Sequence, residues 1–305
     1  MTDLVNGLKD ALEYTRLYRE QTFVIKLGGE VLSSPEALDN VAVQVALLES
    51  LSIRVLVVHG GGPQASALSR RMGLEPKMVA GRRVTSPEVL QVAKMVYAGQ
   101  INVDVVASLR RHGVAAVGLT GIDAGLVTVH RRPPVEITDD EGETSIVDFG
   151  EVGDVDAANT TLLDVLLPRG HVPVVASLAA DPEGRILNVN ADTLAAHLAG
   201  ALGAHKLIYM TGAPGLLRTA DDPSSLVAFA APEDLQALLG SGSIKGGMRP
   251  KVEACLQAVK GGVRRTHIID GRTPDALLLE LFTGHGSGTM IVGEREKRDY
   301  ESAGK

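Results

Sequence analysis

The sequence has few of the residues that form covalent cross-links or stack on bases. Cys255 is the only cysteine, so an intramolecular disulfide is excluded and a reducing compartment such as the cytoplasm is expected. Aromatic residues make up 3% of the chain, so a base-stacking platform is not expected. The net charge is −7, which argues against nucleic-acid binding, because such binding requires a basic patch.

Long hydrophobic runs are also missing. No apolar stretch reaches the roughly 18 residues that a membrane span needs, so no membrane partner is expected. The first 18 residues carry Asp3, Asp10 and Glu13 without a continuous apolar segment, which argues against a secretory signal. Apolar residues still make up 45% of 305 residues, enough for one large or two intimately joined α/β domains.

Short apolar runs alternate with helical patterns along the chain. Buried strands are predicted at Thr22–Leu27, Ile53–Val58, Val114–Leu119, Val172–Ser177 and Lys206–Thr211. Ser34-Pro35 and Ser86-Pro87 each place a capping hydroxyl before a proline, which is typical of a helix start. This order predicts a three-layer αβα sandwich around a largely parallel open sheet.

Four segments fall outside that rhythm. Residues 3–18 have the apolar stripe of an amphipathic helix that need not belong to the core. The polar segment Thr128–Ile146 is predicted to be a β-hairpin flap, and Asp181–Gly184 a tight turn. Residues 294–305 form a charged tail that is expected to fray.

Three glycine-rich turns adjoin predicted strands or helices. Gly28-Gly29 and Gly60-Gly61-Gly62 follow the first two strands, and Gly246-Gly247 precedes a helix that starts near Arg249. Glycine lets backbone N–H groups approach an anion closely, and a helix N-terminus favours negative charge. Any one turn can equally be a simple tight connection, but three together favour phosphate binding. The common GxxxxGK[ST] and GxGxxG nucleotide motifs are absent.

Charged and amide side chains lie beside these turns. Lys26 sits inside an apolar strand and Lys251 in the first turn of a helix, where a polyphosphate would satisfy each charge. A lysine that extends to water at a strand edge is the alternative for each. The run Asn188 to Thr193 offers donors for a carboxylate and an acid, Asp192, although Asn190 by itself predicts a helix cap. Arg82-Arg83 is a second candidate for binding a carboxylate, although a loop arginine by itself is more often simply solvated.

These segments together resemble the amino acid kinase superfamily and, within it, the acetylglutamate kinases. The resemblance runs from about Lys26 to Ile291, and its most specific parts are VIKLGGE, VVHGGGPQ, AGRRVT, GLTGID, NVNADT, KGGMRPK and IIDGR. It implies a mobile N-terminal helix at 1–21, an N-terminal lobe at 22–181 that binds the amino-acid substrate, and a C-terminal lobe at 182–305 that binds ATP. No metal ligand is expected from the chain, because Mg²⁺ would be held mainly by the phosphates of ATP.

The resemblance also implies a role for each site residue. Lys26 and Lys251 would neutralise the transferring phosphoryl group, and Asp192 would orient both lysines. The acceptor substrate would be bound by Gly61, Gly62, Arg83 and Asn188. The nucleotide would be bound by Gly28, Gly29, Gly60, Thr211, Gly212, Gly215, Lys245, Gly246 and Gly247.

The same resemblance predicts regulation and assembly. The N-terminal helix is similar to that of arginine-inhibited family members, in which it interlaces dimers into a hexamer, so a homo-oligomer is expected. Glu280, Gly286 and Gly288 fall where such enzymes bind arginine, whereas Asp275 replaces a usual histidine. Gly212 replaces a usual aspartate, which predicts weaker or altered nucleotide affinity, and Val103 and Ile122 replace usual lysines.

The hypothesis is therefore a cytoplasmic phosphotransferase that makes N-acetyl-L-glutamyl 5-phosphate from ATP and N-acetyl-L-glutamate in arginine biosynthesis, with feedback inhibition by arginine. One alternative is a kinase of a related acyl-amino acid, such as carrier-linked aminoadipate. Another alternative is a non-catalytic arginine-sensing homologue, which is considered because Gly212 replaces the usual aspartate.

Overall fold

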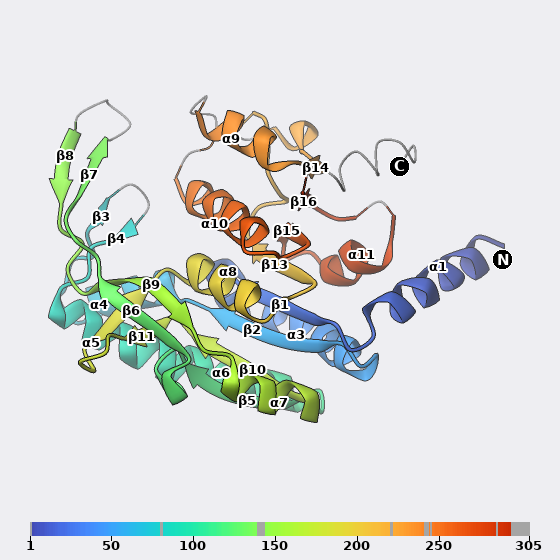
Figure 1. Ribbon diagram of the computed structural model, residues 1–305, viewed down its shortest axis with the longest axis horizontal. Helices are drawn as coiled ribbons and strands as arrows, with labels where there is room; N and C mark the ends of the chain where they lie inside the picture. Colours follow the sequence, from blue (N-terminus) through green and yellow to red (C-terminus); the bar gives the residue numbers. More distant parts are fainter. Residues whose placement is uncertain are drawn as a thin grey trace.

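The computed structural model describes residues 2–79, 82–138, 144–219, 222–240, 244, 246–284 and 286–293. Sixteen strands and eleven α-helices in these ranges make up the molecule shown in Figure 1. The helices are α1 Thr2–Tyr18, α2 Gly29–Leu32, α3 Pro35–Ser50, α4 Gly62–Arg71, α5 Pro87–Lys94, α6 Asn102–Arg111, α7 Thr161–Leu166, α8 Ala191–Ala201, α9 Pro232–Gly240, α10 Met248–Lys260 and α11 Ala276–Phe282.

The strands are β1 Thr22–Leu27, β2 Arg54–His59, β3 Met78–Val79, β4 Arg82–Arg83, β5 Ala115–Thr120, β6 Val127–Arg131, β7 Val135–Thr138, β8 Thr144–Val147, β9 Val152–Ala158, β10 His171–Ala176, β11 Leu178–Ala180, β12 Ile186–Val189, β13 Lys206–Thr211, β14 Phe229–Ala230, β15 Arg265–Asp270 and β16 Thr289–Val292. Short 3-10 turns lie at Asp123–Gly125, Leu167–Arg169 and Pro223–Ser225, and a π-helical segment, η1, at Met95–Ile101.

An eight-stranded sheet forms the centre, in the order β14-β16-β15-β13-β1-β2-β10-β5. Its neighbours pair in parallel except for β15 and β16, so the predicted largely parallel sheet is confirmed. The five strands predicted from apolar runs are β1, β2, β5, β10 and β13, each within one residue of its predicted bounds. At the middle of the sheet, Lys26 on β1 lies opposite Tyr209 on one side and Val58 on the other.

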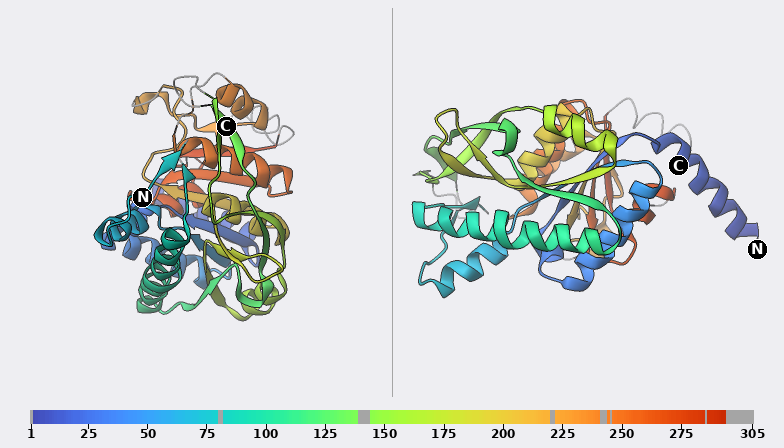
Figure 2. Two further views of the ribbon diagram at one scale, coloured as in Figure 1. Left: turned by 90° about the vertical axis from the view of Figure 1, so that its left-hand side faces the viewer. Right: turned by 90° about the horizontal axis from the view of Figure 1, so that it is seen from below.

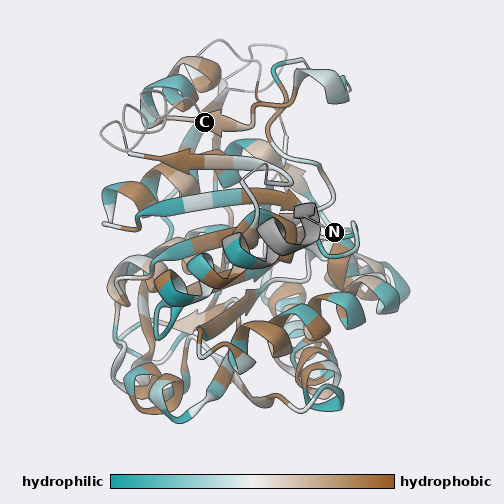
Figure 3. Ribbon diagram, turned by 90° about the vertical axis from the view of Figure 1, so that its right-hand side faces the viewer, coloured by the Kyte–Doolittle hydropathy of each residue, from teal (hydrophilic) through white to brown (hydrophobic). Residues whose placement is uncertain are grey.

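Helices cover both faces of the sheet, as the two views in Figure 2 show. Side chains that alternate along the strands divide into two core clusters. One cluster joins strand residues such as Ile25 and Val57 to α3, η1 and α6, and the other joins Val24 and Val58 to α8 and α10. The helices alternate between hydrophobic and hydrophilic residues along their length in Figure 3, as elements with one face on a core do. The predicted three-layer arrangement is confirmed.

Both predicted helix caps are present. The Ser34 hydroxyl accepts a hydrogen bond from the Ala37 N–H at 3.1 Å, at the start of α3. The Ser86 hydroxyl accepts one from the Val89 N–H at 3.3 Å, at the start of α5. Each cap is followed by proline, which lacks the N–H group that the first turn of a helix leaves without a partner.

The segment that was predicted to be a flap contains two separate structures. Its first residues belong to β6, which pairs with β9 in a small closed barrel of β11, β12, β9 and β6. Its later residues form the β7–β8 hairpin, which rises beside the β3–β4 hairpin in Figure 1. The tight turn at Asp181–Gly184 is confirmed, since the Gly184 N–H donates to the Asp181 carbonyl at 3.0 Å.

Helix α1 extends away from the rest of the molecule, with the N-terminus at its far end (Figure 1). Its last residue, Tyr18, is only 1% exposed, and its ring packs against Phe23, His205 and Phe282 at centroid distances of 5.2, 5.6 and 5.8 Å. The end of the predicted helix therefore belongs to the core, although its start projects. The tail at 294–305 lies outside the described residues. None of the described helices is long and apolar enough to cross a bilayer.

Candidate active site

A cavity of about 270 Å³ opens where β1 and β2 end and α8 begins. Open parallel sheets bind their ligands at the carboxyl ends of their strands, which is where this cavity lies. Ten of the residues predicted from the sequence line it: Lys26, Gly28, Gly29, Gly60, Gly61, Gly62, Arg83, Asn188, Asp192 and Lys251.

The charged centre of the cavity consists of Lys26, Asp192 and Lys251. The Asp192 carboxylate lies 2.7 Å from the Lys26 ammonium through Oδ1 and 3.4 Å from the Lys251 ammonium through Oδ2. The side chains of Lys26 and Asp192 are 8% and 7% exposed, and that of Lys251 is 18% exposed. Two cations therefore share one anion, so the three groups together carry one surplus unit of positive charge.

The ends of two helices position these groups. Asp192 lies in the first turn of α8, where the Asn190 carboxamide oxygen accepts hydrogen bonds from the N–H groups of Asp192 and Thr193, so the predicted cap at Asn190 is confirmed. Lys251 lies in the first turn of α10 and also donates to the Gly247 carbonyl at 3.3 Å. Both helix N-termini add partial positive charge near the cavity.

Burial and charge shift the acidities of this centre in opposing ways. Burial lowers the pKa of Lys26 because it disfavours the ammonium form, and Lys251 adds to that effect while Asp192 counteracts it. Burial by itself would raise the pKa of Asp192, but the two lysines outweigh it and hold that pKa below the usual value. The carboxylate is therefore ionised and requires both lysines as partners.

Steric constraints explain two of the glycines. A Cβ at Gly61, where φ is +156°, would collide with the Ile101 side chain and approach the Tyr97 ring. A Cβ at Gly29 would lie 2.6 Å from the Pro63 ring. The turns after β1 and β2 thus pack on each other and present backbone to the cavity, as an anion site requires.

Arg83 lies beside the Tyr97 side chain and has one guanidinium nitrogen without a hydrogen-bond partner among the described residues. Its Nη2 donates to the Gly62 carbonyl at 2.5 Å and to the Ser66 hydroxyl at 2.6 Å. Its Nη1 is buried and has no hydrogen-bond partner among the described residues. Because an unpaired buried donor is costly, this atom favours an anionic ligand such as a carboxylate. Asn188 donates from Nδ2 to the Thr85 hydroxyl at 3.1 Å.

The residues predicted to bind the nucleotide are not all gathered in this cavity. Thr211, Gly212, Gly215, Gly246 and Gly247 do not line it, and Lys245 lies outside the described residues. The loop at Thr211 is nevertheless adjacent, since the Gly28 N–H donates to the Met210 carbonyl at 2.8 Å. A Cβ at Gly215 would lie 2.6 Å from the Thr289 hydroxyl, so packing accounts for that glycine.

The space beside Gly212 is occupied by another acidic residue. A Cβ at position 212 would lie 2.7 Å from Cγ of Glu30, and the Glu30 carboxylate approaches Gly28 and lines the cavity. The sequence predicted that a carboxylate was missing here, because Gly212 replaces a usual aspartate. Glu30 could not be recognised as a replacement, because it is far from Gly212 along the chain. Arg272 completes the surroundings by donating to the Gly212 carbonyl at 2.6 Å.

Several cavity residues were not found from the sequence. They are Glu30, Met78, Tyr97, Arg132 and Ser177. Each comes from a different part of the chain, and of these only Glu30 stands in a segment that carries the resemblance, VIKLGGE. Arg82, predicted together with Arg83, forms an ion pair with Glu253 on α10 at 3.2 Å, so the β3–β4 hairpin contacts the helix that carries Lys251.

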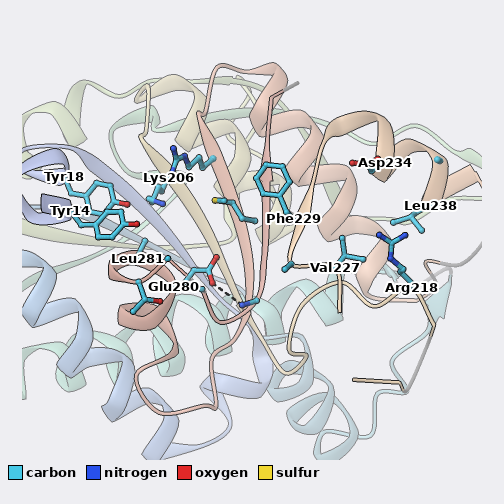
Figure 4. Close-up of a pocket in the computed structure, with 18 residues that line it drawn as sticks. Tyr14, Tyr18, Lys206, Arg218, Val227, Phe229, Asp234, Leu238, Glu280 and Leu281 are labelled. Atoms are coloured by element: carbon cyan, nitrogen blue, oxygen red, sulfur yellow. Dashed lines mark hydrogen bonds between the residues drawn. The ribbon is translucent and has the colours of Figure 1, made fainter. Parts of the chain in front are cut away.

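A larger cavity of about 670 Å³ lies elsewhere, between the end of α1 and the last strands. Tyr14 and Tyr18 from α1 face it together with Lys206, Phe229 and Glu280 (Figure 4). The predicted Gly286 and Gly288 also line it, whereas Asp275 does not. Asp275 is instead the residue before α11, in a left-handed conformation with φ of 57°.

Glu280 belongs to a buried polar network beneath this cavity. Its carboxylate accepts hydrogen bonds from the Gly288 N–H at 3.1 Å and from the His267 ring at 2.6 Å, and the other His267 nitrogen lies 3.2 Å from the Lys206 ammonium. Burial would raise the pKa of Glu280, but the bond from His267 and the nearby charges hold it at about 2. Burial lowers the pKa of His267 to about 4.

The described residues include no group of three or more His, Cys, Asp and Glu side chains arranged to hold a metal ion. The donor set of the cavity is cationic and rich in N–H groups, so it fits a polyphosphate better than a bare cation. A divalent ion that arrived with a nucleotide would depend mainly on the phosphate oxygens.

Comparison with known proteins places these features in a family. Residues 21–270 match the model of the amino acid kinase family. The chain is 45% identical to the acetylglutamate kinase of Myxococcus xanthus over 303 residues, covering 99% of this chain and 98% of that protein. It is 43% identical to the acetylglutamate kinase of Symbiobacterium thermophilum over 285 residues, covering 93% and 96% of the two chains.

Solved structures share the fold. An N-acetylglutamate synthase from Neisseria gonorrhoeae, complexed with coenzyme A and N-acetyl-glutamate, matches with a TM-score of 0.80 and 27% identity over 95% of this chain. The match covers 63% of that synthase, so the chain spans less than two thirds of it. The carbamate kinase from Giardia lamblia bound to AMP-PNP matches with a TM-score of 0.65 and 16% identity over 90% of this chain and 99% of that one, which shows the fold alone.

Proposed function

Because the chain belongs to the amino acid kinase family, we propose that it transfers the γ-phosphoryl group of ATP to the γ-carboxylate of N-acetyl-L-glutamate. The observation that carries this proposal is the buried Lys26–Asp192–Lys251 centre, with its surplus positive charge beside two glycine turns. The product would be N-acetyl-L-glutamyl 5-phosphate, an intermediate of arginine biosynthesis.

The two lysines supply the electrostatic part of the reaction. Phosphoryl transfer depends mostly on positioning and on neutralising the charge of the transferring group. Lys26 and Lys251 approach Asp192 from two different elements. A phosphoryl group that entered the cavity beside Asp192 would therefore lie between the two ammonium groups. Asp192 orients the lysines and is not a base. No base is needed, because the attacking carboxylate is already ionised at neutral pH.

The acceptor would lie on the side of the cavity formed by β2, α4 and β4. The unpaired Nη1 of Arg83 fits one carboxylate, and Asn188 and the N–H groups of Gly61 and Gly62 fit the remaining oxygens. These contacts would hold the γ-carboxylate near the lysines. Proximity of the two reactants then supplies much of the rate enhancement.

ATP would lie on the opposite side, with its phosphates at Gly28, Gly29 and Gly60. Its nucleoside would extend toward Thr211, Gly212, Gly215 and the segment Lys245 to Gly247, although the described residues among these do not line the cavity itself. We propose an acceptor lobe at 22–181 and a nucleotide lobe at 182–305, with Gly28, Gly29 and Gly60 of the first lobe contributing to the phosphate site and Asn188 of the second to the acceptor site. Mg²⁺ bound to the phosphates would add further charge neutralisation.

The test is an ATP-dependent hydroxamate assay, in which hydroxylamine traps an acyl phosphate. N-acetyl-L-glutamate, glutamate, aspartate and an acylated aminoadipate are compared in parallel, with and without arginine. Product from N-acetyl-L-glutamate alone is expected. Product only from the aminoadipate derivative would support the related acyl-amino acid kinase, and no product from any acceptor would favour the non-catalytic alternative.

We also propose that L-arginine binds in the larger cavity and inhibits the enzyme. A synthase of similar fold has been solved with coenzyme A and L-arginine, and here the cavity has Glu280 and two tyrosines of α1 in its wall. Tyr14→Ala should raise the arginine concentration needed for half-inhibition without lowering turnover. Glu13→Ala, at an exposed position of the same helix, is the matched control. Equal inhibition of both variants would contradict this site.

We also propose an oligomeric state and a cellular location for the protein, on the basis of the resemblance to the family. We expect a cytoplasmic homo-oligomer, either a dimer or a hexamer in which α1 interlaces dimers. Leu12 and Leu17 on α1 are 52% and 54% exposed, so the helix offers apolar surface for such a contact. Light scattering on the full chain and on a chain lacking residues 1–12 would test this. That truncation keeps Tyr14 and Tyr18, and an unchanged hexamer would refute the role of the helix.

A further inference from the structure

A buried histidine and asparagine lie behind the glycine turn that follows β2. His59 is the last residue of β2 and is 0% exposed, and Asn102 begins α6 and is 6% exposed. The His59 Nδ1 lies 2.8 Å from the Gly60 carbonyl oxygen, and its Nε2 lies 3.0 Å from the Asn102 amide nitrogen. Neither side chain lines the catalytic cavity. Any role in the reaction therefore has to act through the backbone of the turn.

The partners of Asn102 determine which histidine nitrogen carries the proton. The Asn102 Nδ2 also faces two backbone carbonyls, that of Val174 at 2.9 Å and that of Leu119 at 3.3 Å. Carbonyls can only accept, so the NH₂ end of the carboxamide must be at this position. The His59 Nε2 faces this donor group and the His59 Nδ1 faces the Gly60 carbonyl, which can only accept, so Nδ1 is the protonated nitrogen that donates to Gly60 and Nε2 is unprotonated. Burial lowers the pKa of His59 to about 4, so the ring is neutral and carries one N–H at pH 7.

This hydrogen bond orients a peptide group. In a planar trans peptide the carbonyl and the following N–H point in opposite directions, and no described peptide bond is cis. With the Gly60 carbonyl turned toward His59, the Gly61 N–H must point away from it. No described residue accepts a hydrogen bond from the Gly61 N–H. Gly61 borders the cavity, so its N–H is available to an anion there.

We propose that His59 and Asn102 are positioning residues that aim the Gly61 N–H at the carboxylate of the acceptor substrate. Asn102 donates to the His59 ring, and the His59 ring donates to the Gly60 carbonyl. The Gly61 N–H, at the other end of the Gly60–Gly61 peptide group, then points to the substrate. This inference rests on the proposed function, because it assigns the acceptor subsite to the turn. It predicts that damage to the network weakens acceptor binding and leaves nucleotide binding unaffected, because the Gly60 N–H assigned to the phosphates belongs to the preceding peptide group.

Two substitutions of His59 separate orientation from packing. In His59→Asn the amide nitrogen takes the place of Nδ1 and keeps the donor to Gly60. In His59→Gln the amide oxygen takes the place of Nε2 and keeps the acceptor for Asn102, while the donor to Gly60 is lost. We expect His59→Gln to raise the KM for N-acetyl-L-glutamate about tenfold, the factor that corresponds to about 1.4 kcal/mol, with the KM for ATP unchanged. His59→Asn should stay within about threefold of the wild type.

Equal effects of the two variants on the acceptor KM, or equal effects on both KM values, would overturn the proposal. The wild-type assay separates this result from failure of the proposed function, because an inactive wild type would refute the kinase and leave the tautomer to be tested. Nitrogen-15 NMR of histidine-labelled wild-type protein at pH 7, with the His59 signals assigned from His59→Asn, supplies that test. A protonated Nδ1 and a bare Nε2 are expected, and the opposite tautomer would refute the proposed chain of donors even if the glutamine variant failed to fold.

Discussion

Substitution of Asp192 by asparagine tests the charged centre most directly. The carboxylate is 7% exposed and is the shared partner of Lys26 and Lys251, at 2.7 and 3.4 Å. Its removal leaves two ammonium groups close together with no anion between them. Loss of one partner of a buried ion pair costs about 3–5 kcal/mol, against a total unfolding free energy of about 5–15 kcal/mol for a typical domain. We therefore expect Asp192→Asn to lose a large part of the stability of the wild type.

The same substitution should change the pH dependence of activity. Asp192 raises the pKa of Lys26 and opposes the lowering caused by burial and by Lys251. Without Asp192 the pKa of Lys26 falls further, so this lysine loses its proton at a lower pH. Since only the ammonium form can stabilise the transferring phosphoryl group, turnover of the variant should decline at a lower pH than turnover of the wild type.

Urea unfolding at pH 7 and turnover between pH 6 and 9 measure the two effects. Asp148→Asn is the matched control, because Asp148 forms an ion pair of 2.8 Å with Arg131 at an exposed position and should change little. A stability loss for Asp192→Asn no larger than that of the control would refute the account of the buried centre. Identical pH profiles for the variant and the wild type would refute the account of Lys26.

Three further predictions concern other parts of the molecule. Lys251→Ala should lower turnover by about 10²–10³ while sparing the binding of N-acetyl-L-glutamate in calorimetry, and near wild-type turnover would contradict its role. Arg82→Gln and Glu253→Gln should each lower turnover, and the double variant should be no slower than the worse single one; additive losses would show that the ion pair does not join the hairpin to α10. Because the pKa of His59 falls from 6.5 to about 4 on folding, stability should decrease as the pH falls through that range. In urea unfolding, His59→Asn should reduce the slope by up to about 1.4 kcal/mol per pH unit, and an unchanged slope would show that His59 does not titrate there.

Local signals were sufficient to predict much of the fold. Four of the five predicted strands, β1, β2, β10 and β13, are short apolar runs buried on both faces, whereas β5 lies at the edge of the sheet and is partly exposed. Ser34 and Ser86 cap helices as their sequence context indicated. The small barrel of β6, β9, β11 and β12 was not predicted. Its strands are short, and their pairing is set by contacts between distant segments, which periodicity does not reveal.

The candidate site could be predicted where the chemistry is unusual for its surroundings. Lys26 was conspicuous because a charged residue interrupts an apolar strand, and the glycine turns because they follow strands. Glu30 and His59 carry no such signal. The meaning of Glu30 depends on contact with Gly212, and that of His59 on contact with Asn102, 43 positions away. Such roles arise from folding and cannot be seen in a single sequence.

The continuous central sheet has a mechanical consequence for substrate entry. β1 pairs with β2 on one side and with β13 on the other, so the halves proposed to bind the acceptor and the nucleotide share one hydrogen-bonded sheet. A flexible linker would let two halves swing apart freely, but a sheet resists bending and yields mainly by twisting. Opening of the cavity would therefore require the sheet to twist between β1 and β13. The elastic energy of that twist would favour closure once the products had left.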